Sequence, residues 1–116
     1  MMEKNRFMRI ILFFDLPVVT AKGKREYKRF VNFLISEGFI RLQFSVYCKL
    51  CINADAANTE SKHIMSETPK EGDVRYMIIT ETQYQGIINV NNTHSLQELI
   101  TTDDRTIMIG GMNDEN

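Results

Sequence analysis

The sequence MRIILFFDLP, residues 8–17, decides the fold that we expect for this chain. Ile10 to Phe14 form a short, continuous apolar run rich in β-branched and aromatic residues, which is typical of a strand buried on both faces. Asp15 follows at once, and Pro17 ends the strand, so the sequence places a carboxylate at the end of a central strand. Two interpretations of Asp15 are open at this point: a residue that caps a turn, and a functional group.

The length and composition of the chain predict a single domain. Its 116 residues, 43% of them hydrophobic and 25% charged, are enough to bury about two thirds of the unfolded surface. No apolar stretch reaches the roughly 20 residues of a membrane span, and we see no separate signal-peptide segment. With two cysteines and no export signal, we expect a cytoplasmic protein with reduced thiols and no membrane partner.

Charge is divided unevenly along the chain. Residues 1–51 contain ten Lys/Arg and four Asp/Glu, whereas residues 52–116 contain four Lys/Arg and eleven Asp/Glu. Such asymmetry hints at a surface that binds a polyanion.

A helix is predicted from Thr20 to Glu37, with Thr20 as its N-cap and Gly38 at the C′ position. Its apolar stripe, at helical spacing, contains Tyr27, Phe30, Val31, Leu34 and Ile35. Five cations occupy the other faces of this helix: Lys22, Lys24, Arg25, Lys28 and Arg29. Periodicity alone favours a solvated helix surface for them, and a phosphate-binding ridge is the alternative.

Residues 39–50 alternate in polarity and predict one strand, or two strands broken by a bend. The positions predicted to face the core are Ile40, Leu42, Phe44, Val46, Cys48 and Leu50. The positions predicted to form an outward polar row are Arg41, Gln43, Ser45, Tyr47 and Lys49. Cys48-x-x-Cys51 resembles half a zinc site, but the chain has no second cysteine pair, so we interpret Cys48 as a buried thiol.

The rest of the chain predicts a second helix and further strands. Asn53 is a plausible N-cap for a helix that runs to about Glu67, before Pro69. Its thin apolar stripe consists of Ala57, Ile64 and Met65. Strands are predicted at residues 74–79, 87–90 and 105–109, and a helical turn at residues 95–102.

The predicted order of elements is β-α-β-β-α-β, the ferredoxin-like α+β pattern. We expect one domain over residues 1–116, with appended C-terminal strands at about residues 86–110. In so small a domain the two helices cover one sheet face, and a second copy is the simplest partner for the other face. A homodimer is therefore expected, and the appended strands can add to a neighbouring sheet edge.

Three segments together carry a resemblance to a known family: FFDLP at residues 13–17, GFIRLQFSVY at residues 38–47, and residues 74–84. The chain resembles the Cas-two family, small CRISPR-associated proteins that accompany the integrase in spacer acquisition. The resemblance runs over nearly the whole chain, and QFSVY is its most specific part. Phe-Asp-Leu-Pro and Cys48-x-x-Cys51-x-Asn are most similar to versions from type II CRISPR systems.

The resemblance implies a ferredoxin-like homodimer with Mg²⁺-dependent endonuclease activity on RNA or DNA. Asp15 matches the family's metal-site aspartate, so Asp15 and its symmetry mate would share one Mg²⁺ across the dimer. Ser45 and Arg41 match the polar and basic residues of the second strand. Ser45 would orient water or phosphate as a catalytic residue beside Asp15, and Arg41 would neutralise phosphate charge. Phe14 stands where the family often has tyrosine, so a role for that hydroxyl is absent here.

Two other functions are compatible with the sequence. In the first, a non-catalytic dimer binds duplex DNA through the cations of residues 22–29 and bridges integrase dimers, with residues 105–109 docking the CRISPR integrase subunit. In the second, a ferredoxin-like regulatory module binds a small ligand at its dimer interface. No glycine-rich ligand loop is evident near the strand ends.

Overall fold

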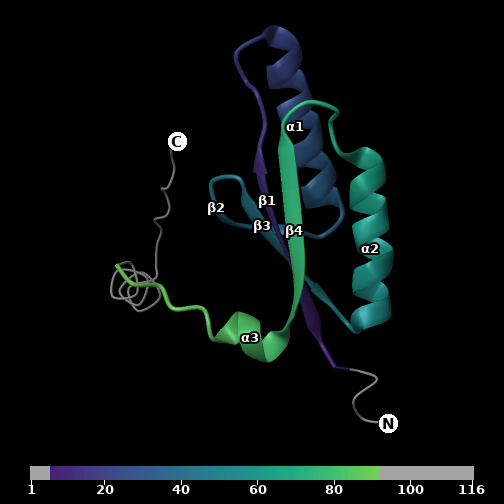
Figure 1. The fold of residues 1–116 in the computed structure, drawn as a ribbon, viewed down its shortest axis with the longest axis vertical. Helices are drawn as coiled ribbons and strands as arrows, with labels where there is room; N and C mark the ends of the chain where they lie inside the picture. The colour runs from purple at the N-terminus through teal and green to yellow at the C-terminus, as the bar shows by residue number, and fades with distance from the viewer. Residues whose placement is uncertain (1–5, 92–116) are drawn as a thin grey trace. The chain divides into compact units, whose positions relative to one another are not determined.

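The computed structural model describes residues 6–91 of the chain (Figure 1). The elements in chain order are β1 (Met8–Asp15), α1 (Ala21–Ser36), β2 (Ile40–Gln43), β3 (Val46–Cys51), α2 (Ala54–Glu67), β4 (Asp73–Thr80) and α3 (Glu81–Gln85). The first six follow the predicted β-α-β-β-α-β order, and α3 is a short helix that the sequence reading missed. One compact unit ends at Gln85 and a second begins at Gly86.

The four strands form one sheet in the order β2-β3-β1-β4. Every neighbouring pair is antiparallel, and β1 pairs with β4 from Met8 opposite Thr80 to Asp15 opposite Asp73. The apolar run of β1 therefore lies in the middle of the sheet. This order of strands is that of a ferredoxin-like fold, so the predicted fold class is confirmed.

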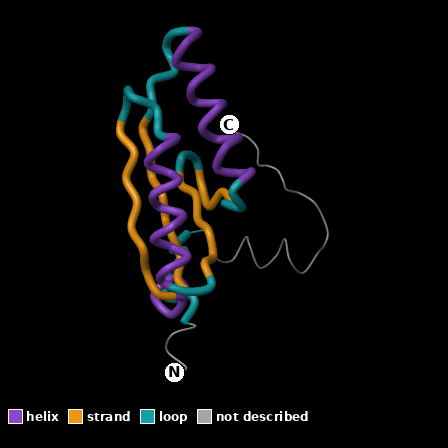
Figure 2. Tube along the Cα trace, turned by 90° about the vertical axis from the view of Figure 1, so that its right-hand side faces the viewer, coloured by secondary structure: helices purple, strands orange, loops and turns teal. Residues whose placement is uncertain are grey.

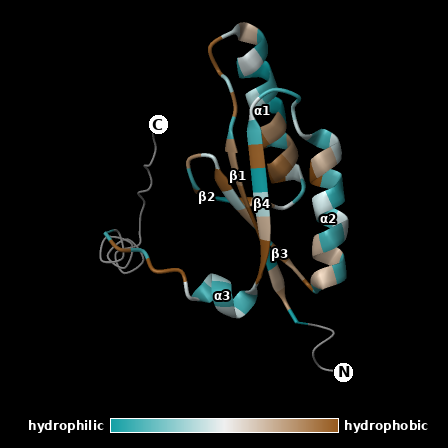
Figure 3. Cartoon of the chain, in the orientation of Figure 1, coloured by the Kyte–Doolittle hydropathy of each residue, from teal (hydrophilic) through white to brown (hydrophobic). Residues whose placement is uncertain are grey.

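Helices α1 and α2 pack on the same face of the sheet (Figure 2). The core between the helices and β1 contains Ile10, Leu12 and Phe14 from the strand, with Phe30 and Leu34 from α1. Phe30 and Leu34 are fully buried. Both helices carry hydrophobic and hydrophilic residues on different sides (Figure 3), as expected when only one side of a helix faces a core.

The predicted ends of both helices are confirmed. The Thr20 hydroxyl accepts a hydrogen bond from the Gly23 amide at 2.9 Å, and the Asn53 side chain accepts one from the Ala56 amide at 2.8 Å. Gly38 has a φ of +95° directly after the C-cap of α1, the left-handed conformation that favours glycine.

The predicted burial of two residues in the apolar stripes of the helices is wrong. Ile35 of α1 and Met65 of α2 are both exposed. Each directly follows a fully buried residue, Leu34 and Ile64 respectively. Because successive helix residues are rotated by about 100°, a side chain one position beyond the centre of the buried stripe points away from the sheet.

The hairpin of β2 and β3 confirms the predicted bend but reverses the predicted faces. Tyr47 stacks on Phe14 at a centroid distance of 5.8 Å, and Cys51 belongs to the helix-side core. Cys48 is fully buried, as predicted for a thiol, but it lies opposite Ile11 on the other face. Both faces of β3 carry apolar residues, so alternation in polarity did not identify the face that the helices cover.

The sheet face away from α1 and α2, called the open face below, is apolar and only partly covered. Four of its large side chains are 40–55% exposed: Phe13, Leu50, Met77 and Ile40. The predicted burial of the 10–14 run on both faces is therefore wrong at Phe13. The expected second copy on this face remains a prediction.

Helix α3 covers one end of the open face. Arg9 of β1 donates to Glu81 at 2.6 Å, and its guanidinium lies 4.1 Å from the ring centroid of Tyr84. Hydrogen bonding to Glu81 raises the pKa of Arg9 above its ordinary value. These contacts hold α3 against the start of β1 and leave the Asp15 end of the open face uncovered by α3.

The strand predicted at residues 87–90 is not formed within the single chain, and its pairing with a partner remains a prediction. These residues form no strand, and Ile87, Ile88 and Val90 are exposed, because an isolated strand needs a partner strand for its backbone groups. The elements predicted at residues 95–102 and 105–109 lie outside the described residues. Within residues 6–91, no helix is both long and apolar enough to cross a membrane.

Candidate metal and nucleic-acid site

Asp15 is the last residue of β1 and lies directly opposite Asp73, the first residue of β4. Directly opposed residues of antiparallel strands point to the same side, with Cβ atoms about 4.5–5.5 Å apart. Both residues are exposed, and with Phe13, Phe14 and Arg75 they line a shallow hollow of about 180 Å³. The chain therefore places two carboxylates side by side at the rim of the open face.

Gly72 allows the turn before β4 to approach the end of β1. Its φ is +99°, and a Cβ atom at this position would lie 2.6 Å from Leu16 Cδ2 and 2.9 Å from the Asp15 carbonyl oxygen. Any larger residue would clash with the backbone that carries Asp15. Glycine at this position is thus the local reason why Asp73 lies beside Asp15.

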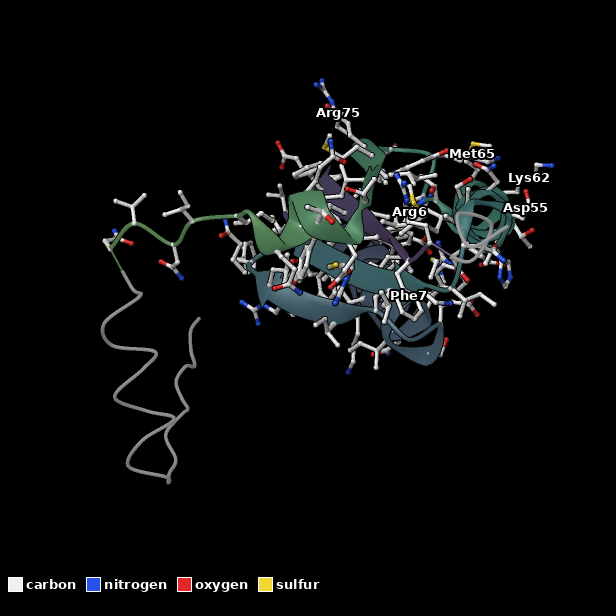
Figure 4. The ribbon with its side chains drawn as sticks, turned by 90° about the horizontal axis from the view of Figure 1, so that it is seen from below. Arg6, Phe7, Asp55, Lys62, Met65 and Arg75 are labelled. Atoms are coloured by element: carbon white, nitrogen blue, oxygen red, sulfur yellow. The ribbon has the colours of Figure 1, made fainter. Side chains whose placement is uncertain are left out.

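Arg75 compensates the charge of Asp73 and not that of Asp15. Its guanidinium donates to Asp73 Oδ2 through Nε at 3.2 Å and through Nη2 at 3.0 Å. The side chain projects away from the body of the molecule (Figure 4). Asp15 has no ion pair within residues 6–91, so its carboxylate can accept a cation.

Ser45 lies in the turn between β2 and β3, next to the end of β1. Its carbonyl oxygen accepts a hydrogen bond from the Phe14 amide at 3.1 Å, and its hydroxyl pairs with the Tyr27 hydroxyl at 3.1 Å. Its φ of +62° is the only positive value at a non-glycine residue within the described part of the chain. Such strained residues often occur at functional sites. The structure brings the backbone of Ser45 to Phe14, the residue before Asp15, while its hydroxyl bonds to Tyr27 of α1.

Arg41 lies farther from Asp15 and on the other side of the sheet. It is opposite Tyr47 in β2, and Tyr47 in turn is opposite Leu12 of β1, so Arg41 shares the helix-covered side. Strand spacings place it roughly 14 Å from Asp15 within one chain. Burial raises the pKa of Tyr47, and the charge of Arg41 opposes this effect.

The five cations of α1 do not form one uniform group. Lys22, Lys24, Arg25 and Lys28 are exposed, and no ion pair involves them within residues 6–91. Arg29 instead contacts Glu26 at 3.1 Å and Glu67 at 3.3 Å, which joins α1 to the end of α2. Four cations are therefore available for phosphate, on the helix that covers the other side of the sheet from Asp15.

Within residues 6–91, two groups of side chains can hold a cation. Asp15 and Asp73 supply hard oxygen ligands, which suit Mg²⁺ because this ion keeps several waters and needs only one or two carboxylates. A separate group combines Glu37, Glu60 and His63, with ligand atoms within 4.8 Å of one another. The sequence motifs indicated Asp15 alone.

The sequence predicts a turn at Lys70-Glu71-Gly72, which the structure confirms, but it did not identify Asp73 as a neighbour of Asp15. The available signal was the order Lys70-Glu71-Gly72-Asp73 directly before a strand, in which a glycine turn carries an acid into the first strand position. Without the pairing register of β1 and β4, nothing placed that acid opposite Asp15.

Comparison with known proteins agrees with the motifs. A sequence model of the family described as "CRISPR associated protein Cas2" matches residues 8–87. A protein of Lacticaseibacillus rhamnosus named CRISPR-associated endoribonuclease Cas2 is 39% identical over 88% of this chain and 100% of its own length. Proteins of the same name from Ligilactobacillus salivarius (39% identical, 88% and 100% covered) and Streptococcus mutans (37% identical, 89% and 94% covered) are similarly related.

Proposed function

This chain belongs to the Cas2 family of CRISPR-associated proteins, and from that premise we propose that it is a Mg²⁺-dependent endonuclease that cleaves RNA or DNA in spacer acquisition. The observation that carries the proposal is the exposed carboxylate of Asp15, which lies beside Asp73 at the rim of an apolar sheet face. The named relatives are endoribonucleases, so single-stranded RNA is the first substrate to test.

The open face supports a homodimer as the active form. Phe13 and Met77 are 40% and 50% exposed, and apolar surface of this kind is stabilised by burial against a partner. Two-fold symmetry makes such an interface self-complementary. Because Asp15 shares this side of the sheet, pairing two open faces would bring Asp15 towards its symmetry mate.

Each residue at the site has a proposed task. A bound Mg²⁺ would polarise the scissile phosphate and acidify a water. Asp15 would hold this ion together with its mate, and Asp73, already paired with Arg75, would accept hydrogen bonds from its waters. The Ser45 turn would fix the end of β1 through the Phe14 amide, and a dimer mate's surface would exclude solvent from one side.

Cleavage of a labelled single-stranded RNA, with a DNA oligonucleotide in parallel, tests the enzymatic proposal. We expect cleavage with Mg²⁺, none with EDTA, and background levels for Asp15→Asn. The matched control is Asp55→Asn, since Asp55 projects from the outer side of α2 (Figure 4). Equal cleavage by Asp15→Asn and the unmodified chain would assign the activity to a contaminant.

Sedimentation velocity tests the dimer separately from catalysis. Met77→Lys places a charge on the open face, midway along the edge strand β4, and is expected to shift the chain from dimer to monomer at micromolar concentration. Lys62→Met, on the outer side of α2 (Figure 4), is expected to leave the dimer unchanged. A monomeric unmodified chain would exclude the shared-ion geometry.

The four exposed cations of α1 favour a second function, a scaffold that binds duplex DNA and bridges integrase dimers. Contacts from Lys22, Lys24, Arg25 and Lys28 to phosphates would bind without reading sequence. The integrase subunit would dock on residues 105–109, in a cytoplasmic complex. Deletion of residues 104–116 should then abolish co-purification with the integrase.

The salt dependence of duplex binding tests the scaffold. Each phosphate contact contributes about 0.9 to the slope of log affinity against log salt, so Lys24→Glu with Lys28→Glu should lower that slope by about two. Lys62→Glu on α2 is the matched control. An unchanged slope in the double variant would place the DNA on another surface.

A further inference from the structure

Three side chains from two helices converge beside the C-terminal end of α1. Glu37 is the C-cap residue of α1, and Glu60 and His63 are three residues apart on α2, which places them on one face of that helix. One carboxylate oxygen from each glutamate and one ring nitrogen of His63 lie within 4.8 Å of one another. The His63 ring also packs edge-on against Phe33, with centroids 5.3 Å apart, so the orientation of the ring is fixed.

Glu60 supplies the observation that points to a ligand. The residue is only 9% exposed, and its Oε1 accepts a hydrogen bond from Lys49 Nζ at 2.7 Å. Its Oε2 is buried and has no hydrogen-bond partner within the described residues. A buried carboxylate oxygen normally bonds to a donor or a cation, so this atom lacks the partner that its burial demands.

We propose that Glu37, Glu60 and His63 bind a divalent cation of the zinc type. An imidazole nitrogen with two carboxylates suits Zn²⁺ better than Mg²⁺, which prefers oxygen ligands alone. Ligands of a tetrahedral zinc lie about 3.4 Å apart, given bonds of about 2.1 Å. No pair of these atoms therefore needs to approach by more than about 1.4 Å. His63 Nδ1 and Glu37 Oε1, which are hydrogen-bonded at 2.9 Å, would instead move apart by about 0.5 Å when an ion replaces the hydrogen between them. The half-exposed His63 leaves a fourth position open to water.

Lys49 distinguishes this group from a simple surface ion pair. It neutralises one oxygen of Glu60 and holds the carboxylate in place, the role of an outer-shell partner at a metal centre. Glu37, Glu60 and Lys49 together leave one negative charge before any ion binds, which favours a divalent cation over a further anion. The ion would tie the end of α1 to the middle of α2 at the level of Lys49.

The proposed site is separate from the one at Asp15. Lys49 lies opposite Ile10 in the sheet, five residues before Asp15 along β1, or roughly 17 Å along the strand. Zinc binding by the three residues therefore does not depend on the proposed nuclease function. Either can fail while the other stands.

Calorimetric titration of the full chain with Zn²⁺, in a reducing buffer, tests the proposal. We expect one ion per chain and affinity at least about tenfold weaker in Glu60→Gln and in His63→Ala. His94→Ala is the matched control, because the chain has two histidines, and should bind as the unmodified chain does. Co²⁺ in place of Zn²⁺ should give visible absorption bands that His63→Ala loses.

The folding of each variant is checked by circular dichroism, and Glu37→Gln, at the end of α1, replaces any variant that does not fold. Unchanged Zn²⁺ affinity in Glu60→Gln and His63→Ala would overturn the proposal, as would the absence of Zn²⁺ binding by the unmodified chain. Loss of binding in Asp15→Asn or Cys51→Ser, with normal binding in the three ligand variants, would also overturn it.

Discussion

The two faces of the sheet differ in how much of their apolar surface the chain itself buries. On the face that α1 and α2 cover, Ile10, Leu12 and Phe14 are almost completely buried. On the open face, Phe13 from the same strand is 40% exposed. The continuous apolar run in β1 therefore serves both faces of the sheet. Between the three residues that the helices cover, Ile11 is also buried, whereas Phe13, nearer to Asp15, stays exposed in the single chain.

The same division separates the charges that carry the two proposed functions. The exposed cations of α1 lie on the covered side, whereas Asp15 and Asp73 lie at the rim of the open side. A DNA scaffold would use the first surface and a nuclease the second. The two functions can therefore be removed separately by substitutions on opposite sides of the sheet.

The largest expected effect comes from the covered face. Phe30 is fully buried and packs edge-on against Phe14, with ring centroids 5.4 Å apart. Phe30→Ala should lower the free energy of unfolding by about 3–5 kcal/mol. Denaturant unfolding at several protein concentrations measures the effect, and the same loss at every concentration would locate it within one chain.

Leu50→Ala on the open face tests whether removing a side chain there destabilises the single chain less than Phe30→Ala does on the covered face. Because Leu50 is 44% exposed, its removal from a monomer should cost at most about 1.5 kcal/mol. A cost that grows with protein concentration would mean that a second copy covers Leu50. A cost as large as that of Phe30→Ala at all concentrations would contradict the division into two faces.

The covered face could largely be predicted from the sequence, because helical periodicity and capping residues are local signals. Thr20, Asn53 and Gly38 predicted the helix ends, and Phe30 and Leu34 the buried stripe of α1. The motif FFDLP likewise placed Asp15 at the end of a central strand. These features depend on residues within a few positions of one another.

The features that the sequence reading missed depend on contacts between distant segments. The sequence did not show which residues of β3 face the helices. Tyr47 faces them and stacks on Phe14, but Cys48 on the other face is also buried, so burial does not alternate along the strand. Asp73 becomes a candidate site residue only because the pairing register of β1 and β4 places it opposite Asp15. Glu37, Glu60 and His63 come from two helices and show no motif along the chain beyond the spacing of the last two.

Alanine substitutions at two glycines with nearly the same φ, Gly38 and Gly72, test whether the turn before β4 must pack closely against the end of β1. At Gly72 a Cβ atom would clash with Leu16 and the Asp15 carbonyl, whereas at Gly38 its nearest neighbour is Lys49 Cε at 3.6 Å. Gly38→Ala should therefore cost about 1 kcal/mol for backbone strain alone, and Gly72→Ala about 2–3 kcal/mol. Thermal unfolding measures both.

Nuclease assays on the folded glycine variants sharpen this test. Gly72→Ala should also lower cleavage, because it moves Asp73 away from Asp15, and Gly38→Ala should not. If the two variants lose the same stability and cleave RNA equally well, the turn before β4 can move without cost and Gly72 does not set the position of Asp73.

The smallest expected effect concerns the end of the open face that α3 covers, and it depends on pH. Hydrogen bonds from Arg9 and then Gln85 hold the pKa of Glu81 below its ordinary value. A carboxyl whose pKa is lower in the folded state stabilises the fold above its unfolded pKa, about 4.3, and this contribution is lost as the pH falls through the folded pKa. Glu81→Gln should therefore be less stable than the unmodified chain at pH 7, and the difference should shrink towards pH 3.

Denaturant unfolding at both pH values measures this difference, with Glu71→Gln in the exposed turn before β4 as the control. If the two chains differ equally at pH 7 and pH 3, Glu81 acts through packing and not through its charge. If Glu81→Gln also exposes Cys48 to thiol reagents, then the ion pair of Arg9 with Glu81 keeps α3 over this end of the sheet, since Arg9 Nη1 lies 3.7 Å from Cys48 Sγ. The open face would then be divided into an end that the chain covers with its own helix and an end, at Asp15, that is left for a partner.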